Sequence, residues 1–252
     1  LKHLENNWYF SENDGGTEIF FDIDFEIQNK FLNVLMSKSF EFGLNKIADA
    51  FQKRAEDLYK PIELANRMLL CGSSLEDSGW YVQIERFVQN RYWSKTKALN
   101  STLDYAAIQP TLLLYPDGSI QALCRSKSGR LTESWSTNGG KKWSRMRRSQ
   151  LPNPNAGADG TVLADGRALL VYNHTLNGRS PLNVAVSSNG KEWEAALVLE
   201  NQSGEYSYPA AIQTSDGNVH VTYTHNRTNI KHVVIDPSKL KTVAISQGQW
   251  PQ

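Results

Sequence analysis

The first 60 residues combine a strand-like pattern with a helix-like pattern. In residues 17–27 apolar side chains alternate with mostly polar ones, which is typical of a strand with one buried face. The turn-forming letters SENDGG separate this stretch from residues 8–10, so a hairpin is expected. Between Leu44 and Leu58 apolar residues recur every three or four positions, which predicts an amphipathic helix. Because a hairpin and one helix cannot enclose a core, we expect this segment to be the end of a longer domain.

A repeat of strand, turn and strand replaces the helical period from residue 61 onward. Its turns are centred on Asn66, Asp117, Asp165 and Asp216, at spacings of 51, 48 and 51 residues. A period near 50 is typical of the blades of a β-propeller, each built from about four strands. The sequence therefore predicts about four blades.

Tryptophan keeps the same period. Trp93, Trp143 and Trp193 follow one another at intervals of 50 residues. The letters STNGGKKW and SSNGKEW, which end at the last two, fit the pattern S-x-D-x-G-x-x-W with Asn in place of Asp, and VQNRYW is a weaker version. Glycine suits the turn, Asn can hydrogen-bond its backbone, and Trp can pack beneath it. We therefore expect these boxes to stabilise the blades rather than to contact a ligand.

The repeat and the boxes make residues 61–240 resemble the sialidase superfamily, and most closely the bacterial sialidase-like proteins with BNR or Asp-box repeats. The likeness is carried by IQPTLLLYPDGSIQALCRSKSGR, LPNPNAGADGTVLADGRALLVYN and GEYSYPAAIQTSDGNVHVTYTHNRTNIKHVVIDPSKL. It implies a six-bladed type of propeller, of which this chain holds about four blades. It also implies a parental activity, the exo-sialidase cleavage of terminal sialic or related acidic sugars.

The opening segment resembles a different family. TEIFFDIDFEIQNKFLNVLMSKSF followed by IADAFQKRAEDLY is similar to the carboxyl-terminal part of the coenzyme Q-binding proteins of the polyketide cyclase/START-like superfamily, over about residues 1–59. We therefore expect a mainly β chain in two parts. Residues 1–60 would be a small α+β fragment of a START-like, helix-grip domain, and residues 61–252 an incomplete sialidase-like β-propeller.

Three residues match the positions at which the sialidase superfamily binds and cleaves its substrate. A sialic acid carries a carboxylate, and an arginine pair is a natural clamp for that group because a guanidinium binds it in a bidentate fork. Arg125 and Arg179 stand where the family places its second and third clamp arginines, each one strand ahead of a box. Tyr206 matches the nucleophile, 27 residues after Arg179. The alternative is that both arginines are solvated strand ends and that Tyr206 is a packed ring.

The chain also departs from the family's pattern. Gln109, sixteen residues before Arg125, replaces the glutamate that assists the tyrosine in many sialidases. An amide can hydrogen-bond a phenol but cannot take its proton, so we expect Gln109 to bind substrate rather than to act as a base. Tyr208, followed by proline, competes with Tyr206 for the nucleophile position. The first clamp arginine and the acid/base aspartate belong to blades that would precede residue 61, so no residue is assigned to either role.

Composition and charge reduce the number of function classes that fit the sequence. Lys and Arg number 27 and Asp and Glu 26, and a net charge of +1 excludes a broadly basic surface for nucleic acid. The apolar runs are far shorter than the roughly 18 to 20 residues that cross a bilayer. Without a C-x-x-C pair or a His-rich tract we expect no metal ion and no other cofactor. With no export signal in view we expect a cytoplasmic protein.

We therefore expect a sialidase-like, glycoside-hydrolase-related propeller that binds or cleaves terminal acidic sugars, with catalysis impaired by missing blades. Two alternatives remain: a non-enzymatic lipid-binding or quinone-binding START-like protein, or a propeller that serves only as an interaction module. An incomplete ring exposes blade edges, through which the chain would form a homo-oligomer unless residues 1–60 cover an edge. A fusion or truncated product that folds poorly is the outcome we favour.

Overall fold

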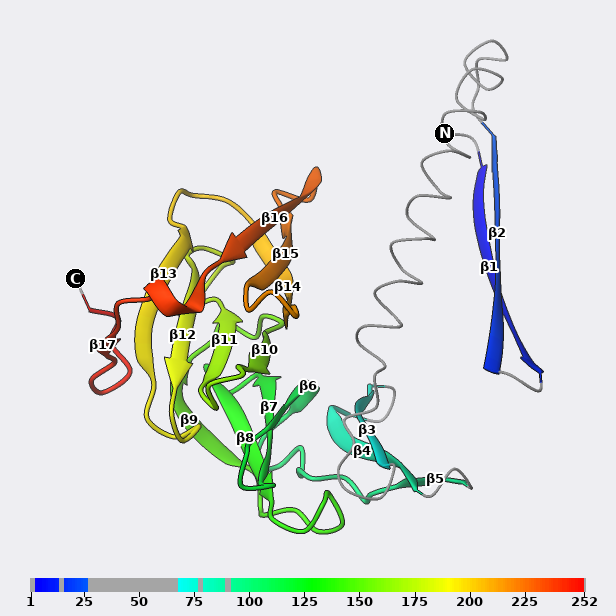
Figure 1. Cartoon of the computed structure of the whole chain (residues 1–252), viewed down its shortest axis with the longest axis horizontal. Helices are drawn as coiled ribbons and strands as arrows, with labels where there is room; N and C mark the ends of the chain where they lie inside the picture. The colour runs from blue at the N-terminus through cyan, green and yellow to red at the C-terminus, as the bar shows by residue number, and fades with distance from the viewer. Residues whose placement is uncertain (1–2, 14–15, 27–67, 77–78, 89–91, 252) are drawn as a thin grey trace. The chain divides into compact units, whose positions relative to one another are not determined.

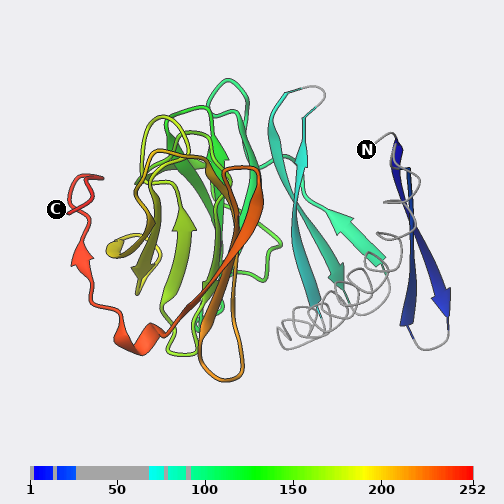
Figure 2. The same ribbon diagram turned by 90° about the horizontal axis from the view of Figure 1, so that it is seen from above.

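The computed structural model describes residues 3–13, 16–26, 68–76, 79–88 and 92–251. Contacts divide the chain into two compact units, Leu1–Pro61 and Ile62–Gln252. The first contains an antiparallel hairpin of β1 (His3–Asn13) and β2 (Gly16–Glu26), dark blue in Figure 2. This confirms the predicted hairpin and makes its first strand longer than expected. The predicted helix between Leu44 and Leu58 lies outside the described residues, and the START-like resemblance stays a prediction.

The second unit is built from antiparallel sheets in which strands that follow one another in the chain lie side by side (Figure 1). In chain order its strands are β3 (Met68–Leu75), β4 (Tyr81–Val88), β5 (Tyr92–Lys95), β6 (Ala107–Leu114), β7 (Ile120–Ser126), β8 (Arg130–Ser136), β9 (Arg147–Pro152), β10 (Asp159–Val162), β11 (Ala168–Tyr172), β12 (Leu182–Ser187), β13 (Glu194–Glu200), β14 (Tyr206–Gln213), β15 (Val219–His225), β16 (Asn229–Ile235) and β17 (Val243–Ala244). The sheets have the orders β3-β4-β5, β6-β7-β8-β9, β10-β11-β12-β13-β17 and β14-β15-β16. The first strands of the last three sheets, β6, β10 and β14, meet, because β10 contacts both of the others.

Three hairpins of the second unit share one turn. In each, an aspartate side chain accepts a hydrogen bond from the backbone N–H two residues later, and the intervening glycine has a positive φ, which glycine adopts without strain. The acceptor and donor residues are Asp117 and Ser119 (2.9 Å), Asp165 and Arg167 (3.0 Å), and Asp216 and Asn218 (3.1 Å). These hairpins, β6–β7, β10–β11 and β14–β15, confirm three of the predicted repeat units. The turn centred on Asn66 lies outside the described residues.

The two boxes form as predicted. In the first, Ser136 Oγ accepts from Gly140 N at 3.0 Å and Trp143 Nε1 donates to the carbonyl oxygen of Gly140 at 3.0 Å. The second repeats these bonds with Ser187, Gly190 and Trp193, at 2.8 and 3.2 Å. The boxes therefore tie the end of one strand to the start of the next. Trp93 differs from the other two tryptophans, because it lies within β5, is 53% exposed and packs on Phe87.

The core lies between neighbouring sheets. Strand β11 is buried along its whole length, and its side chains alternate between two clusters. Leu170 and Tyr172 join the cluster shared with β6–β9, whereas Leu169 and Val171 join the one shared with β14–β16. Burial on both faces explains why β11 reads as a continuous apolar run rather than an alternating one.

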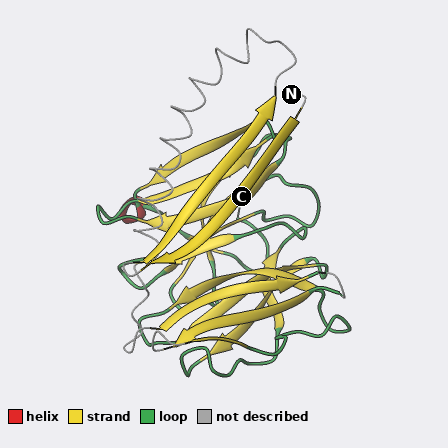
Figure 3. Cartoon of the chain, turned by 90° about the vertical axis from the view of Figure 1, so that its right-hand side faces the viewer, coloured by secondary structure: helices red, strands yellow, loops and turns green. Residues whose placement is uncertain are grey.

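Helical structure is scarce in the described residues. A single 3-10 turn, Pro237–Lys239, follows β16 and is red in Figure 3. No helix in the described part of the chain has the length and apolar character that a bilayer crossing requires. The fold is therefore mainly β, as the sequence predicts.

Candidate ligand-binding site

The predicted site residues lie at one end of the strands, opposite the shared turns. Arg125 is near the end of β7, a strand that begins next to the turn at Asp117. Gln109 is near the start of β6, which ends at the same turn. Arg179 precedes β12, whose far end carries a box. The turns and boxes thus occupy one end of the sheets and the candidate residues the other.

The guanidinium groups of Arg125 and Arg179 converge on one oxygen atom. Arg125 Nη1 donates to the backbone carbonyl of Asn155 at 3.2 Å, and Arg179 Nη2 donates to the same oxygen at 3.3 Å. Arg179 Nη1 also donates to the carbonyl of Pro154 at 3.3 Å. The loop that carries this acceptor is turned sharply, because Asn155 has a φ of 62°. The two arginines therefore form a pair, although 54 residues separate them in the sequence.

One donor of this pair is unused. Arg125 Nε is buried and has no hydrogen-bond partner among the described residues. The guanidinium carbon of Arg125 lies 5.2 Å from the ring centroid of Trp80, which fixes the side chain by a cation–π contact. A buried donor without an acceptor costs stability, and an acceptor on a ligand would satisfy it.

The structure separates the two candidate tyrosines. Tyr206 is 3% exposed and belongs to the core cluster of β11 and β15, with its ring centroid 5.2 Å from that of His225. Tyr208 is 56% exposed. The pairing of β14 with β15 shifts between Ser207 and Ala210, and at this bulge Tyr208 has a φ of 51°. Tyr206 thus lies in the packed position that the alternative interpretation describes, and Tyr208 is the accessible ring.

Tyr208 and Gln109 occupy equivalent positions in the repeat. Each lies eight residues before its turn aspartate and is followed by proline, and Gln109 has a φ of 53°. Gly157 holds the same position before Asp165. A Cβ atom on Gly157 would lie 3.1 Å from Tyr208 Cδ1 and 3.8 Å from Gln109 Oε1, so the three positions meet in space. Left-handed backbone at residues other than glycine is uncommon and gathers at functional sites.

An ion pair that the sequence did not reveal borders Tyr208. Arg227 Nε lies 2.6 Å from Glu205 Oε2. The hydrogen bond and charge of Arg227, with a smaller contribution from Arg179, lower the pKa of Glu205. Backbone pairing joins Arg179 to Glu205, and Tyr206 N donates to the carbonyl of Arg179 at 3.1 Å. A third guanidinium is therefore present at this end of the strands.

Other polar residues near these strand ends have structural partners. Asp159 Oδ1 accepts from Thr111 Oγ1 at 2.8 Å and its Oδ2 accepts from Ala211 N at 2.9 Å, so it joins β10 to β6 and to β14. His174 Nε2 lies 3.1 Å from the carbonyl oxygen of Gly248. Within the residues that the structure describes, no three His, Cys, Asp or Glu side chains gather closely enough to hold a metal ion.

We name the group of Gln109, Arg125, Gly157, Arg179 and Tyr208 the arginine site. It combines two guanidinium groups that can bind a carboxylate, an exposed phenol and an amide. The sequence analysis named Arg125, Arg179, Gln109 and Tyr208 as candidates, and the structure places all four at this end of the strands. The sequence analysis missed Asn155, Gly157 and Trp80, because these lie on connecting segments whose approach depends on the packing of separate sheets.

The chain belongs to the family of the BNR repeat-like domain, which matches residues 58–221. Among solved structures it is similar to the intramolecular trans-sialidase of Ruminococcus gnavus in complex with oseltamivir carboxylate, at 19% identity and a TM-score of 0.60, over 72% of this chain and 43% of that one. The intramolecular trans-sialidase of a leech, complexed with 2,7-anhydro-Neu5Ac, shares 19% identity at a TM-score of 0.55, over 75% of this chain and 31% of that one.

A sialidase of Streptococcus pneumoniae is also similar, at 14% identity and a TM-score of 0.58, over 71% of this chain and 30% of that one. This chain spans less than half the length of these three proteins. No curated protein matches it. The fold of the second unit is therefore that of the sialidase-related β-propellers, and the START-like resemblance of residues 1–59 has no support in these comparisons.

Proposed function

We propose that this chain binds a terminal sialic acid or a related acidic sugar through its carboxylate at Arg125 and Arg179. The observation that carries the proposal is the convergence of both guanidinium groups on the carbonyl oxygen of Asn155. Two positive groups at one oxygen suit a carboxylate, which offers two oxygens to such forks. The sialidase-related fold supports this choice of sugar over a general interaction module.

We further propose that Tyr208, rather than Tyr206, faces the sugar. Tyr208 is exposed and close to Gly157, at the repeat position that Gln109 also holds. Tyr206 contributes to the core and stays away from the ligand. Gln109 then donates a hydrogen bond from its amide, either to the phenol or to the sugar.

Hydrolysis by this chain is proposed to be weak. A tyrosine nucleophile needs a neighbouring base, and Gln109 cannot accept the phenolic proton. The four sheets of the second unit would be four blades of a six-bladed type. Efficient cleavage of an aryl sialoside by the chain alone would contradict this part of the proposal. A cytoplasmic location and quinone or lipid binding by residues 1–59 remain predictions.

Calorimetric titration with oseltamivir carboxylate and with 2,7-anhydro-Neu5Ac tests the binding proposal. We expect Arg125→Ala and Arg179→Ala each to remove about 2 kcal/mol of binding free energy, which is about a 30-fold loss of affinity. Arg148→Ala is the matched control, because Arg148 is an exposed arginine of β9 that packs over Tyr105. Thermal unfolding of each variant verifies that it folds.

Two results would overturn the proposal. The first is an absence of binding by a chain that unfolds cooperatively. The second is an equal loss of affinity in Arg148→Ala, which would assign the effect to net charge rather than to the arginine pair.

A further inference from the structure

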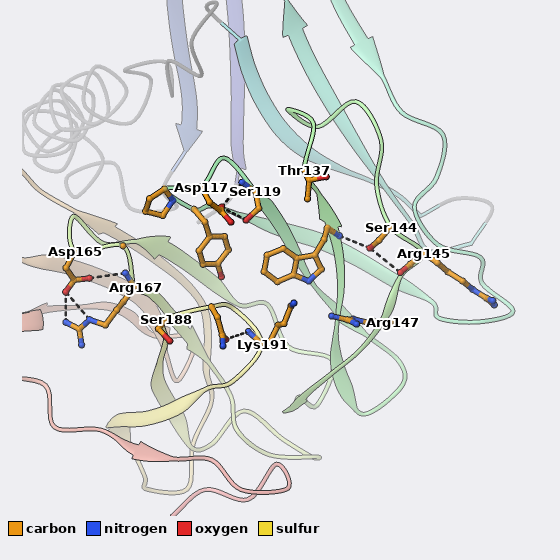
Figure 4. A pocket seen from close by; sticks show the side chains of 15 residues that line it. Asp117, Ser119, Thr137, Ser144, Arg145, Arg147, Asp165, Arg167, Ser188 and Lys191 are labelled. Atoms are coloured by element: carbon orange, nitrogen blue, oxygen red, sulfur yellow. Dashed lines mark hydrogen bonds and ion pairs between the residues drawn. The ribbon is translucent and has the colours of Figure 1, made fainter.

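A second pocket lies at the opposite end of the strands from the arginine site. Its volume is about 1000 Å³. Figure 4 shows Asp117 and Ser119 from the turn after β6, Asp165 and Arg167 from the turn after β10, and Lys191 from the second box around it. The pocket therefore lies between the sheet of β6–β9 and the sheet that begins with β10. Because the turns and boxes form its rim, we name it the turn-end pocket.

Two aromatic rings form an apolar wall of this pocket. Tyr115 and Trp135 are stacked, with ring centroids 5.5 Å apart and an angle of 23° between the rings. Trp135 Nε1 donates to Glu133 Oε2 at 3.1 Å, and the hydroxyl of Tyr115 donates to Gln121 Oε1 at 2.8 Å. Gln121 Nε2 in turn donates to Glu133 Oε2 at 2.6 Å. This buried network fixes both rings before any ligand arrives, which lowers the cost of binding.

Two cations beside these rings have donors to spare. Arg147 Nε donates to Glu133 Oε1 at 2.8 Å, but Arg147 makes no other hydrogen bond within the described residues and its side chain is 57% exposed. Its two terminal nitrogens are therefore available. Lys191 Nζ lies 5.9 Å from the ring centroid of Trp135 and has no ion pair in the part of the chain that is described.

The other basic side chains of the pocket are already neutralised. Arg145 Nη2 lies 2.8 Å from Asp104 Oδ2, and Arg167 Nη2 lies 2.7 Å from Asp165 Oδ2. Among the described lining residues, Lys191 is the basic side chain without an acid partner, and Arg147, whose Nε is bound by Glu133, keeps its two terminal nitrogens for a ligand.

We propose that the turn-end pocket binds an acidic saccharide. The C–H groups of the sugar ring contact Trp135, which Tyr115 supports from behind, and the carboxylate or sulfate of the sugar is bound by Arg147 and Lys191. A neutral sugar would leave Lys191 and the terminal nitrogens of Arg147 without an anionic partner. A small inorganic anion would leave the aromatic wall exposed, so the two features together select a sugar that carries a negative group. The pocket is separate from the arginine site, and its ligand does not depend on what that site binds.

Calorimetry with three tetrasaccharides tests the proposal: one from hyaluronan with carboxylates, one from chondroitin sulfate with carboxylates and sulfates, and neutral chitotetraose. We expect one or both acidic sugars to bind at least about tenfold more tightly than chitotetraose. The comparison of the two acidic sugars identifies the preferred anion. Tryptophan fluorescence, quenched on binding, gives a second readout because Trp135 lines the pocket.

The variants are chosen to keep the buried network intact. Arg147→Lys keeps a cation for Glu133 but removes the free fork, and Lys191→Gln removes the second charge. We expect each to weaken the acidic sugar about five- to tenfold. Arg145→Gln removes a cation of the same pocket that is paired with the exposed Asp104, and it should bind as the parent does. Arg125→Ala, which changes the arginine site, is measured in parallel to show which site holds the sugar.

Four results would overturn the proposal. Three of them are equal affinity for chitotetraose, an equal loss in Arg145→Gln, and no binding of either acidic sugar by the folded chain. Loss in Arg125→Ala with no loss in Lys191→Gln would likewise overturn it, because it would move the sugar to the arginine site.

Discussion

The two ends of the strands in the second unit differ in how regular they are. At the turn end, the same aspartate turn occurs three times and the same box twice, with hydrogen bonds that match to within a few tenths of an ångström. At the other end, the equivalent positions before each turn hold Gln109, Gly157 and Tyr208, and two of these have a left-handed backbone. The turn end therefore repeats one local structure, whereas the other end has a different residue at each equivalent position.

This difference separates residues that hold the sheets together from residues that are free to serve a ligand. A repeated turn or box satisfies the backbone polar groups within it, so these groups hold the strands together rather than bind a ligand. The irregular end keeps a buried guanidinium nitrogen without a partner, on Arg125. Substitutions of the turn aspartates and box tryptophans should therefore affect stability, whereas substitutions in the arginine site should affect the binding of its ligand.

The largest expected effect is on the box tryptophan Trp193. It is 2% exposed within the core cluster, so Trp193→Ala should lower the free energy of unfolding by about 3–5 kcal/mol. Trp93→Ala, at the half-exposed tryptophan of β5, should cost about 1 kcal/mol or less. Urea denaturation followed by circular dichroism measures both. Equal losses would mean that the box does not stabilise the fold more than an exposed strand residue does.

A smaller loss of stability is expected from a substitution of Asp159. This residue lies at the end of the strands that carries the arginine site, which we call the arginine end, but it joins three strands. Removal of its carboxylate leaves Thr111 Oγ1 and Ala211 N without this acceptor, so Asp159→Ala should cost about 2 kcal/mol. Asp104→Ala breaks an exposed pair with Arg145 and should cost less than about 1 kcal/mol. The same denaturation experiment compares them. If Asp159→Ala instead left stability unchanged and abolished sugar binding, Asp159 would belong with the ligand residues.

The two tyrosines give a sharper contrast between core and site. Tyr208→Ala should weaken the acidic sugar about fivefold, the free energy of one aromatic contact, and leave the unfolding midpoint nearly unchanged because the ring is exposed. Tyr206→Ala should instead cause a large loss of stability and leave the affinity for the acidic sugar nearly unchanged. Calorimetry and thermal unfolding of both variants measure this. A stable Tyr206→Ala that no longer binds would restore Tyr206 as the ligand residue.

The smallest effect concerns His174, which follows β11 at the arginine end. Burial is the main cause that lowers its pKa below the usual value. The imidazole of His174 is therefore protonated more readily in the unfolded chain than in the folded one. The contribution of His174 to the free energy of unfolding is complete above about pH 6.5 and falls as the pH drops toward the lowered pKa. Between about pH 7.5 and about pH 5.5, His174→Gln should lose less stability than the parent. Parallel pH curves of the two chains would refute this assignment.

The regular end could be predicted from the sequence, and the irregular end only in part. The turn aspartates and boxes determine their own local structure, so their spacing was enough to predict the hairpins. The choice between Tyr206 and Tyr208 depends on a bulge in β14, which moves the exposed position by altering the pairing with β15. The proline after Tyr208 was the signal that the sequence analysis used, and the place of Tyr208 eight residues before Asp216 is a second signal that could have found it.

Contacts between separate segments could not be predicted. The shared acceptor at Asn155 and the pair of Glu205 and Arg227 depend on how loops from different sheets approach. The turn-end pocket was also missed, because its lining residues come from the same turns and boxes that the sequence assigns to structure alone. Their side chains still line a space between two sheets, which no spacing along the chain reveals.

The most direct test of the carboxylate clamp removes the charge from the ligand and from the protein in turn. Oseltamivir carboxylate and its ethyl ester would be titrated by calorimetry into the parent chain and into Arg125→Ala. The clamp predicts that esterification weakens binding about 30-fold in the parent and by a clearly smaller factor in Arg125→Ala, because one of the two guanidinium partners of the carboxylate is already gone. Equal losses in both chains would show that Arg125 does not bind the carboxylate and would contradict the proposed function.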